Sequence, residues 1–218
     1  MRERYEEELK KLNASIISMG KMIEIAIEGS VLALMEWDLA SCDEIIKNDD
    51  AIDEMEKEIE QLCVRLLLQQ QPMASDLRMV TAALKMVTDM ERIGDHAGDI
   101  ADLIKQMGNG KAIANSMGKY ANAKLEQMCS EIQKMLYNSI SAYIDRDVSK
   151  AKDVIANDDI VDELYFKLKR EFVRQIQIKI ENGEEIADFL LIAKYFERIG
   201  DHATNIAEWV IYSITGLR

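Results

Sequence analysis

The chain has 218 residues, a length that suits one large domain or two domains of about 100 residues each. One proline and ten glycines leave few positions for turns, so we expect long helices and no sheet. The formal net charge of −13 repels nucleic-acid phosphates and anionic lipids. This charge excludes a protein that binds the nucleic-acid backbone and favours cations or a basic partner surface.

The cysteines and the N-terminal residues predict a cytoplasmic protein. Cys42, Cys63 and Cys129 are odd in number, lack zinc-site spacing and lie inside helical patterns, so reduced and mostly buried thiols are expected. Residues 1–11 are rich in charge and contain no apolar signal core. The apolar run around residues 189–193 is far shorter than the roughly 18 residues of a membrane span. We therefore expect neither export nor direct membrane insertion.

Apolar residues at helical spacing predict three long helices in the first half of the chain, over residues 9–34, 39–70 and 75–107. Pro72 should end the second of these helices, and Ser75 is predicted to be the N-cap of the third. The sequence Gly108-Asn109-Gly110 then predicts a break in the chain.

Three further helices are expected in the second half, over residues 117–144, 147–178 and 183–218. Asn182-Gly183 is the predicted turn before the last helix. The core positions of that helix alternate three and four apart, as in the seam of a bundle. They are Ile186, Phe189, Ala193, Phe196, Gly200, Ala203, Ala207, Val210 and Ile214. We interpret Met79, Met86 and Met90 as core packing.

Two motifs occur once in each half. Residues 91–97 recur unchanged as residues 197–203, an offset of 106. The asparagine and the acids of residues 48–54 recur in residues 157–163, an offset of 109. The sequence therefore predicts an all-α fold of two tandem three-helix bundles, with six long helices, related by internal duplication. The expected repeats are residues 1–108 and 109–218.

Four carboxylates in each half are predicted to lie at the same height. Asp49 and Asp53 are four residues apart and share one helix face, as do Glu91 and Asp95. Asp53 and Glu91 are equally far from Pro72 along the chain, and so are Asp49 and Asp95, so an antiparallel hairpin brings all four together. The second half repeats this symmetry about its own turn. These acids should be half-exposed beside the core.

Carboxylates that lie this close repel one another, by roughly 3 kcal/mol for two unit charges about 5 Å apart at an effective dielectric near 20. A bound cation would relieve the repulsion, and oxygen ligands select hard ions such as Mg²⁺, Mn²⁺, Ca²⁺ or iron. A single acidic pair on a helix is usually a solvated face, but the mirrored repetition favours metal binding. The predicted ligands are Asp49, Asp53, Glu91, Asp95, Asp99, Asp158, Asp162, Glu197 and Asp201. Asp99 corresponds to Asn205, so two unequal sites are expected.

The other residues of the repeated motif have expected structural roles. Gly94 and Gly200 would allow a neighbouring helix to approach closely. His96 and His202 are turned about 100° from the preceding aspartate, which favours a surface or packing role over ligation. The arginines expected to pair with nearby acids are Arg92 and Arg198.

At these residues the chain resembles the PhoU family, over essentially its whole length. The segments 71–78 and 89–96 resemble the family signature, and the duplicated acidic pairs are its hallmark. The resemblance implies two three-helix bundles side by side. It also implies multinuclear clusters of iron, zinc, manganese or magnesium on the acidic pairs. The first motif departs from the family at Gly98-Asp99, where the second retains Thr204-Asn205.

The same resemblance implies a cytoplasmic negative regulator of phosphate uptake. Such a protein would be an adaptor between the ATPase subunit of the phosphate ABC transporter and a phosphate-sensing histidine kinase, and not an enzyme. A homodimer is also expected.

Two other readings remain open from the residues alone. One is a helical interaction module whose acids only maintain solubility. The less favoured one is a metal-dependent hydrolase, because two divalent ions about 4 Å apart can activate water. The sequence contains no Gly-rich phosphate loop, no nucleophile elbow and no glutamate three residues before either histidine.

Overall fold

The structure, a computed structural model, describes residues 2–69, 74–107, 110–116 and 118–217. Within these ranges the chain forms six long α-helices, one short α-helix and a 3₁₀ turn, and no strand. The elements are α1 (Arg2–Glu36), α2 (Leu39–Gln69), α3 (Ala74–Gln106), α4 (Gly110–Ser116), α5 (Lys119–Asp145), α6 (Val148–Ile178), η1 (Ile180–Asn182) and α7 (Gly183–Thr215). Residues 70–72, the boundary predicted at 108/109 and Met117 lie wholly or partly outside the described residues.

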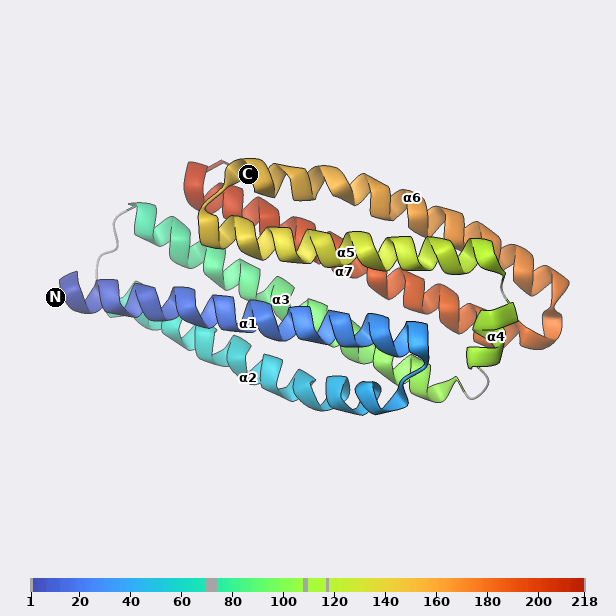
Figure 1. The fold of residues 1–218 in the computed structure, drawn as a ribbon. Helices are drawn as coiled ribbons and strands as arrows, with labels where there is room; N and C mark the ends of the chain where they lie inside the picture. Colours follow the sequence, from blue (N-terminus) through green and yellow to red (C-terminus); the bar gives the residue numbers. More distant parts are fainter. Residues whose placement is uncertain (1, 70–73, 108–109, 117, 218) are drawn as a thin grey trace.

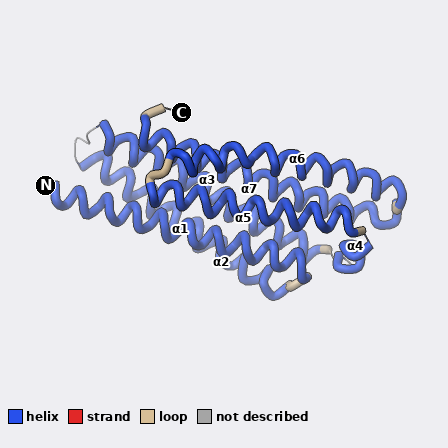
Figure 2. Tube along the Cα trace, turned by 45° about the horizontal axis from the view of Figure 1, so that its top comes forward, coloured by secondary structure: helices blue, strands red, loops and turns tan. Residues whose placement is uncertain are grey.

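Two antiparallel three-helix bundles lie side by side in an elongated molecule (Figure 1). Helices α1, α2 and α3 form the first bundle, and α5, α6 and α7 form the second. Contacts of α3 with α7 join the two bundles, and α1 meets α5 as well, an arrangement that the turned view shows again (Figure 2). The predicted all-α fold of two three-helix bundles is confirmed.

The turn between the first two helices is built in the same way in both repeats. Trp37 after α1 and Arg146 after α5 both have left-handed backbones, with φ of 62° and 53°. The next residue then caps the following helix. Asp38 accepts a hydrogen bond from the Ala40 backbone at 3.1 Å, and Asp147 accepts one from the Ser149 backbone at 2.8 Å. The duplication therefore extends to backbone conformation where the residue type differs.

The connection between the repeats contains a helix that the sequence did not predict. Helix α4 ends before Gly118, whose φ of +90° turns the chain into α5. The position 109 residues earlier is Leu9, inside α1, where the helix is continuous. Glycine adopts positive φ at little cost, whereas leucine does not. The segment that forms the first two turns of α1 in the first repeat is thus a separate helix, α4, in the second.

The predicted N-cap at Ser75 is wrong, because α3 already includes Ala74. The Ser75 hydroxyl instead lies 3.4 Å from the Asp76 carboxylate.

The core follows the predicted seams. All predicted α7 positions are buried except Ile214, which is partly exposed. The three cysteines are buried free thiols, as expected. Met86 and Met90 are buried, whereas Met79 is half-buried and lines a pocket.

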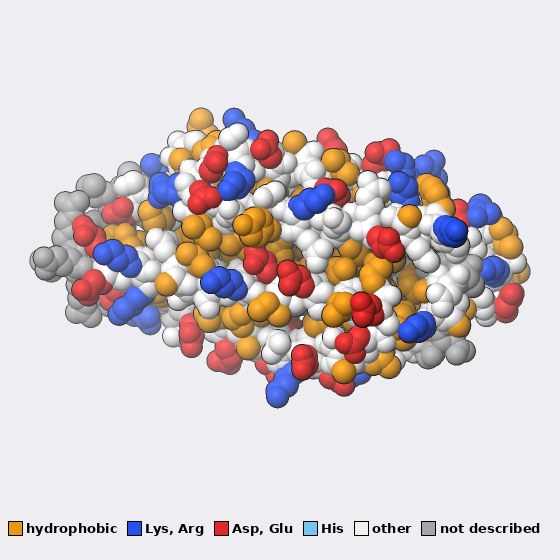
Figure 3. All heavy atoms as spheres, viewed as in Figure 1, with side chains coloured by type: hydrophobic (Ala, Val, Ile, Leu, Met, Phe, Trp, Pro, Cys, Tyr) orange, Lys and Arg blue, Asp and Glu red, His pale blue; other side chains and the backbone are white. Residues whose placement is uncertain are grey.

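No helix among the described residues is both apolar and long enough to cross a bilayer. Charged side chains are scattered among apolar ones over the face that Figure 3 shows.

Substitution of two phenylalanines of α6 measures how much burial in this core contributes to the free energy of unfolding. Phe172 is fully buried, so Phe172→Ala should lower the free energy of unfolding by about 3–5 kcal/mol through lost burial and a cavity. Phe166 is 57% exposed, so Phe166→Ala on the same helix should change it by less than about 0.5 kcal/mol. Urea denaturation followed by circular dichroism measures both, and equal losses would contradict the described packing.

Candidate metal centres

The predicted carboxylates of the first repeat meet where α2 packs on α3. Ligand oxygens of Asp49, Asp53 and Asp95 all lie within 4.8 Å of one another. Glu91 lies one helical turn before Asp95 on α3, and all four side chains are half-buried, as predicted. No other group of three or more potential ligands in the described residues is this compact. We call these four residues the N-terminal cluster.

Two glycines of α3 make room for Asp49. A Cβ atom added at Gly94 would lie 3.2 Å from Asp49 Oδ1 and 3.0 Å from Ile52 Cδ1. One added at Gly98 would lie 3.4 Å from Asp49 Oδ2. The missing side chains therefore let α2 bring its carboxylate against the α3 backbone. The close approach predicted at Gly94 is confirmed, and the part of Gly98 was missed because Thr204 stands there in the second motif.

Burial and mutual repulsion make negative charge costly in the N-terminal cluster. Burial, and then the charges of Asp95 and Asp53, raise the pKa of Asp49 to about 6. Burial, and then Asp95, raise the pKa of Glu91 to about 7 against the opposing charge of Arg92. Burial is also the main cause of the raised pKa of Asp95. At neutral pH the surroundings therefore disfavour the negative charge of these carboxylates, and a bound cation would stabilise that charge.

Three oxygens of the N-terminal cluster are buried without a hydrogen-bond partner, namely Asp49 Oδ1, Asp53 Oδ1 and Glu91 Oε2, although the last lies 3.4 Å from Arg92 Nε. Buried carboxylate oxygens normally have a partner. Hard cations bind carboxylate oxygens at about 2.0–2.6 Å, so two oxygens that share one ion lie within about 5 Å of each other. The residues present therefore fit a metal ion of this class.

The second repeat brings its four acids to the contact between α6 and α7. These residues, the C-terminal cluster, are Asp158, Asp162, Glu197 and Asp201. Burial, and then Asp201, raise the pKa of Asp158 to about 6. Burial is also the main cause of the raised pKa of Glu197. Partial loss of water around the carboxyl raises the pKa of Asp201, although the residue as a whole is exposed. Glu197 is buried and Asp201 is exposed, so the prediction of half-exposed acids is wrong for these two.

A lysine distinguishes the two clusters. The Lys194 ammonium pairs with the Glu197 carboxylate. The residue 106 positions earlier is Thr88, which offers no positive charge. Lys194 also opposes the rise in the pKa of Glu197 and of Asp201. Lys194 therefore neutralises part of the charge of the C-terminal cluster from a position that carries no charge in the first repeat.

Asp99 lies at the junction between the repeats and not within the compact group. Its Oδ2 is 3.6 Å from His96 Nδ1, and its side chain is 48% exposed. Its charge, after burial, raises the pKa of the Tyr195 hydroxyl on α7. A ligand role for Asp99 remains a prediction. In the structure Asp99 interacts with His96 and Tyr195, at the junction between the repeats.

The histidines of the motif pack at this junction, as expected. The His96 ring is buried, with centroids 5.4 Å from Tyr195 and 5.6 Å from His202. Burial lowers the pKa of His96 to about 4. His202 Nδ1 lies 2.9 Å from Asp89 Oδ1, which also accepts a hydrogen bond from Asn205 at 3.0 Å.

Asp89 and Tyr195, whose roles at the junction were not predicted, occupy equivalent positions two residues before each repeated glutamate. Because their residue types differ, the internal repeat does not mark them.

The arginines of the motif behave differently from each other. Arg92 lies 2.9 Å from Asp95 Oδ2 and 3.4 Å from Glu91 Oε2, so its predicted pairing is confirmed. Arg198 is exposed and forms no ion pair with the acids that the structure describes, so the predicted contact is wrong there, although the charge of Arg198 opposes the rise in the pKa of Asp201.

Comparison with known proteins agrees with this architecture. The PhoU domain matches the chain twice, over residues 16–104 and 125–210. The chain belongs to the PhoU domain family. The paired matches coincide with the two bundles, which supports the internal duplication.

Relatives in this family share the whole length of the chain. The phosphate-specific transport system accessory protein PhoU homolog of Clostridium acetobutylicum is 39% identical over 99% of this chain and 96% of its own. The crystal structure of PhoU from Pseudomonas aeruginosa has a TM-score of 0.89 at 32% identity and covers 97% of this chain and 99% of its own. That of the phosphate transport system regulatory protein PhoU from Streptococcus pneumoniae has a TM-score of 0.86 at 30% identity, with 97% of each chain covered.

The raised pKa values predict how stability depends on pH in the presence of a chelator. Consider a carboxyl group whose pKa is higher in the folded protein than in the unfolded chain. It stabilises the folded state fully when the pH is below its pKa in the unfolded chain. This contribution is lost as the pH rises through its pKa in the folded protein. Stability should therefore fall between about pH 4 and pH 7, the window set by Asp49 and Glu91.

Asp49→Asn should reduce that fall and stabilise the metal-free protein at pH 8 by about 1 kcal/mol, after allowance for solvent screening of this half-exposed group. Urea titrations at several pH values measure it. Glu44→Gln, at an exposed position of the same helix, should leave the slope unchanged. An unchanged slope in Asp49→Asn would contradict the described repulsion.

Proposed function

We propose that this chain is a cytoplasmic, metal-binding adaptor in the negative regulation of phosphate uptake. In this role it links the ATPase subunit of a phosphate ABC transporter to a phosphate-sensing histidine kinase, as a homodimer and without turnover of its own. Its family membership and the names of its relatives, phosphate-specific transport system accessory proteins, support a place in this system.

The observation that carries the metal-binding part is the compact group of Asp49, Asp53 and Asp95. Three carboxylates with close oxygens, two of them with a buried oxygen that lacks a hydrogen bond, form a better cation site than an acidic helix face. Iron, manganese and magnesium fit an all-oxygen ligand set best, and zinc fits it less well. A bound ion would neutralise the crowded charges and connect α2 to α3.

The adaptor part is supported by charge. The chain carries a net charge of −13, and metal ions would lower the negative charge locally at the two clusters. Partner binding to the clusters would then depend on metal loading, because a bare cluster attracts basic surfaces and a loaded one attracts them less. This dependence separates the proposal from an interaction module whose acids only maintain solubility.

We predict that the N-terminal cluster binds Mn²⁺ more tightly than the C-terminal cluster, because Asp49, Asp53 and Asp95 form the only such compact ligand group among the described residues. Lys194 competes with a cation for Glu197, as Arg92 does for Asp95. Isothermal titration should show that Asp158→Asn keeps the tighter site and that Asp49→Asn keeps the weaker one, about tenfold apart. Lys194→Met should strengthen the weaker site.

A variant with Asp49→Asn, Asp95→Asn, Asp158→Asn and Asp201→Asn should lose both sites. Equal Mn²⁺ binding by this variant and the native protein would refute the metal centres. Metal-dependent phosphatase activity that is lost in Asp95→Asn would instead support the hydrolase.

In the source cell, deletion of the gene should switch on phosphate-uptake genes while external phosphate is abundant, because the proposed restraint is removed. A transcriptional reporter measures this, with the native gene restored as the control. Complementation by the four-acid variant tests the metal centres separately from the regulatory role. A silent reporter, together with affinity purification that enriches neither transporter nor kinase, would count against the adaptor.

A further inference from the structure

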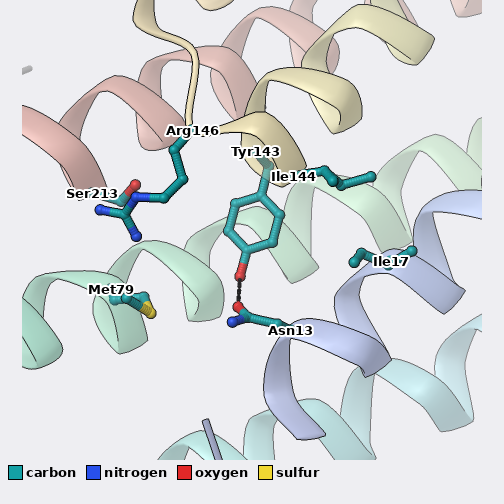
Figure 4. A pocket seen from close by; sticks show the side chains of 7 residues that line it. All are labelled: Asn13, Ile17, Met79, Tyr143, Ile144, Arg146 and Ser213. Atoms are coloured by element: carbon teal, nitrogen blue, oxygen red, sulfur yellow. Dashed lines mark hydrogen bonds between the residues drawn. The ribbon is translucent and has the colours of Figure 1, made fainter. Parts of the chain in front are cut away.

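A pocket of about 130 Å³ lies between the two repeats. Figure 4 shows the side chains that line it, and Figure 1 shows that the C-terminal end of α5, which contributes Tyr143, lies at the end of the molecule where both termini are found. Its walls come from four helices and from the turn after α5. Asn13 and Ile17 belong to α1, Met79 to α3, Tyr143 to α5 and Ser213 to α7, and Arg146 lies in the turn. The volume corresponds to roughly four water molecules. No residue of either acidic cluster lines it.

The equivalent place in the other repeat is filled by α4. Asn122, the counterpart of Asn13, donates a hydrogen bond to the Ala114 carbonyl of α4 at 3.2 Å. Met107, the counterpart of Ser213, accepts one from the Gly110 backbone at 3.1 Å. The counterpart of Arg146 is Trp37, whose ring lies so close to Gly110 that an added Cβ atom would approach it to 2.0 Å. The pocket therefore corresponds to a position that α4 of the same chain fills at the other end of the molecule.

The pocket is open because α1 does not fold back as α4 does. Gly118 allows the turn that separates α4 from α5, and Leu9 at the equivalent position continues the helix. The residue that reaches this place from the left-handed position is also different. It is an aromatic ring, Trp37, at the filled end and a guanidinium, Arg146, at the open end.

The polar groups of the pocket suit an anion. Arg146 forms no ion pair with the acids that the structure describes, and its guanidinium extends toward Ser213 (Figure 4). The Tyr143 hydroxyl donates a hydrogen bond to Asn13 Oδ1, which leaves the amide nitrogen of Asn13 as a second donor. The Ser213 hydroxyl donates to the Val210 carbonyl at 2.7 Å, so it is less available.

The charge and the walls narrow the class of anion. One guanidinium balances one negative charge, and its planar fork matches the two oxygens of a carboxylate. The rest of the strongly acidic chain disfavours a second negative charge. Ile17 and Met79 supply apolar surface beside these donors, which suits an aliphatic chain better than a fully hydrated ion.

We propose that this pocket binds a small aliphatic monocarboxylate. Arg146 and the Asn13 amide hold its carboxylate, and its apolar part lies against Ile17 and Met79. The proposal is independent of the metal centres.

The test is a titration of the full chain, labelled with ¹³C at the methionine methyl groups, with sodium butyrate at constant ionic strength. The Met79 signal, assigned with Met79→Leu, should shift and saturate with a Kd on the order of 1 mM, as expected for so small a ligand. Butyramide, which lacks the charge, and inorganic phosphate, which is mostly a dianion at pH 8, should bind at least about tenfold more weakly.

Matched variants identify the site. Arg146→Met should weaken butyrate binding at least about tenfold, while Arg170→Met, at an exposed position of α6, should leave it unchanged. Ile17→Phe should abolish binding by filling the pocket while Arg146 is retained. The proposal is overturned if the signal does not saturate by about 20 mM butyrate, or if butyramide or phosphate binds as well as butyrate. It is also overturned if Arg170→Met weakens binding as much as Arg146→Met does.

Discussion

The repulsion between carboxylates that the helix packing forces together is the constraint on which both acidic clusters depend. The close approach of α2 to α3 at Gly94 holds the Asp49 carboxylate half-buried against the α3 backbone. Burial there is tolerable only if the charge is removed or balanced. Arg92 balances part of it in the first repeat, and Lys194 balances part of it in the second. The same packing that stabilises each bundle thus brings together negative charges that positive charge must balance.

Most of the fold and the positions of the acids could be predicted from the sequence, because the duplication shows them twice. Equal distances from Pro72 place Asp53 and Glu91 at one height, whatever the details of the turn. What the duplication could not show are the positions where the repeats differ. Lys194 and Asp89 shape the surroundings of the clusters, yet their counterparts are Thr88 and Tyr195, so comparison of the halves carried no signal for them.

Helix α4 shows a second limit of sequence reasoning. Its seven residues cover about two turns, which is too short for apolar periodicity to define a face. Gly108 and Gly110 indicated one break, whereas the bend that matters structurally is at Gly118, where φ is +90°. A glycine at a helix start is ordinary, and only its backbone angle shows that it redirects the chain. The exposure of Asp201 likewise depends on side-chain neighbours that spacing does not define.

The folding back of α4 at one end has a consequence for the molecule as a whole. A perfect duplication would give a rod with a twofold axis, whose two ends a binding protein could not tell apart. Such a rod would accept a partner in either orientation and could recruit one copy at each end. Because α4 occupies one end only, the rod has a direction, and a protein that recognises either end can bind in a single orientation with one copy per chain.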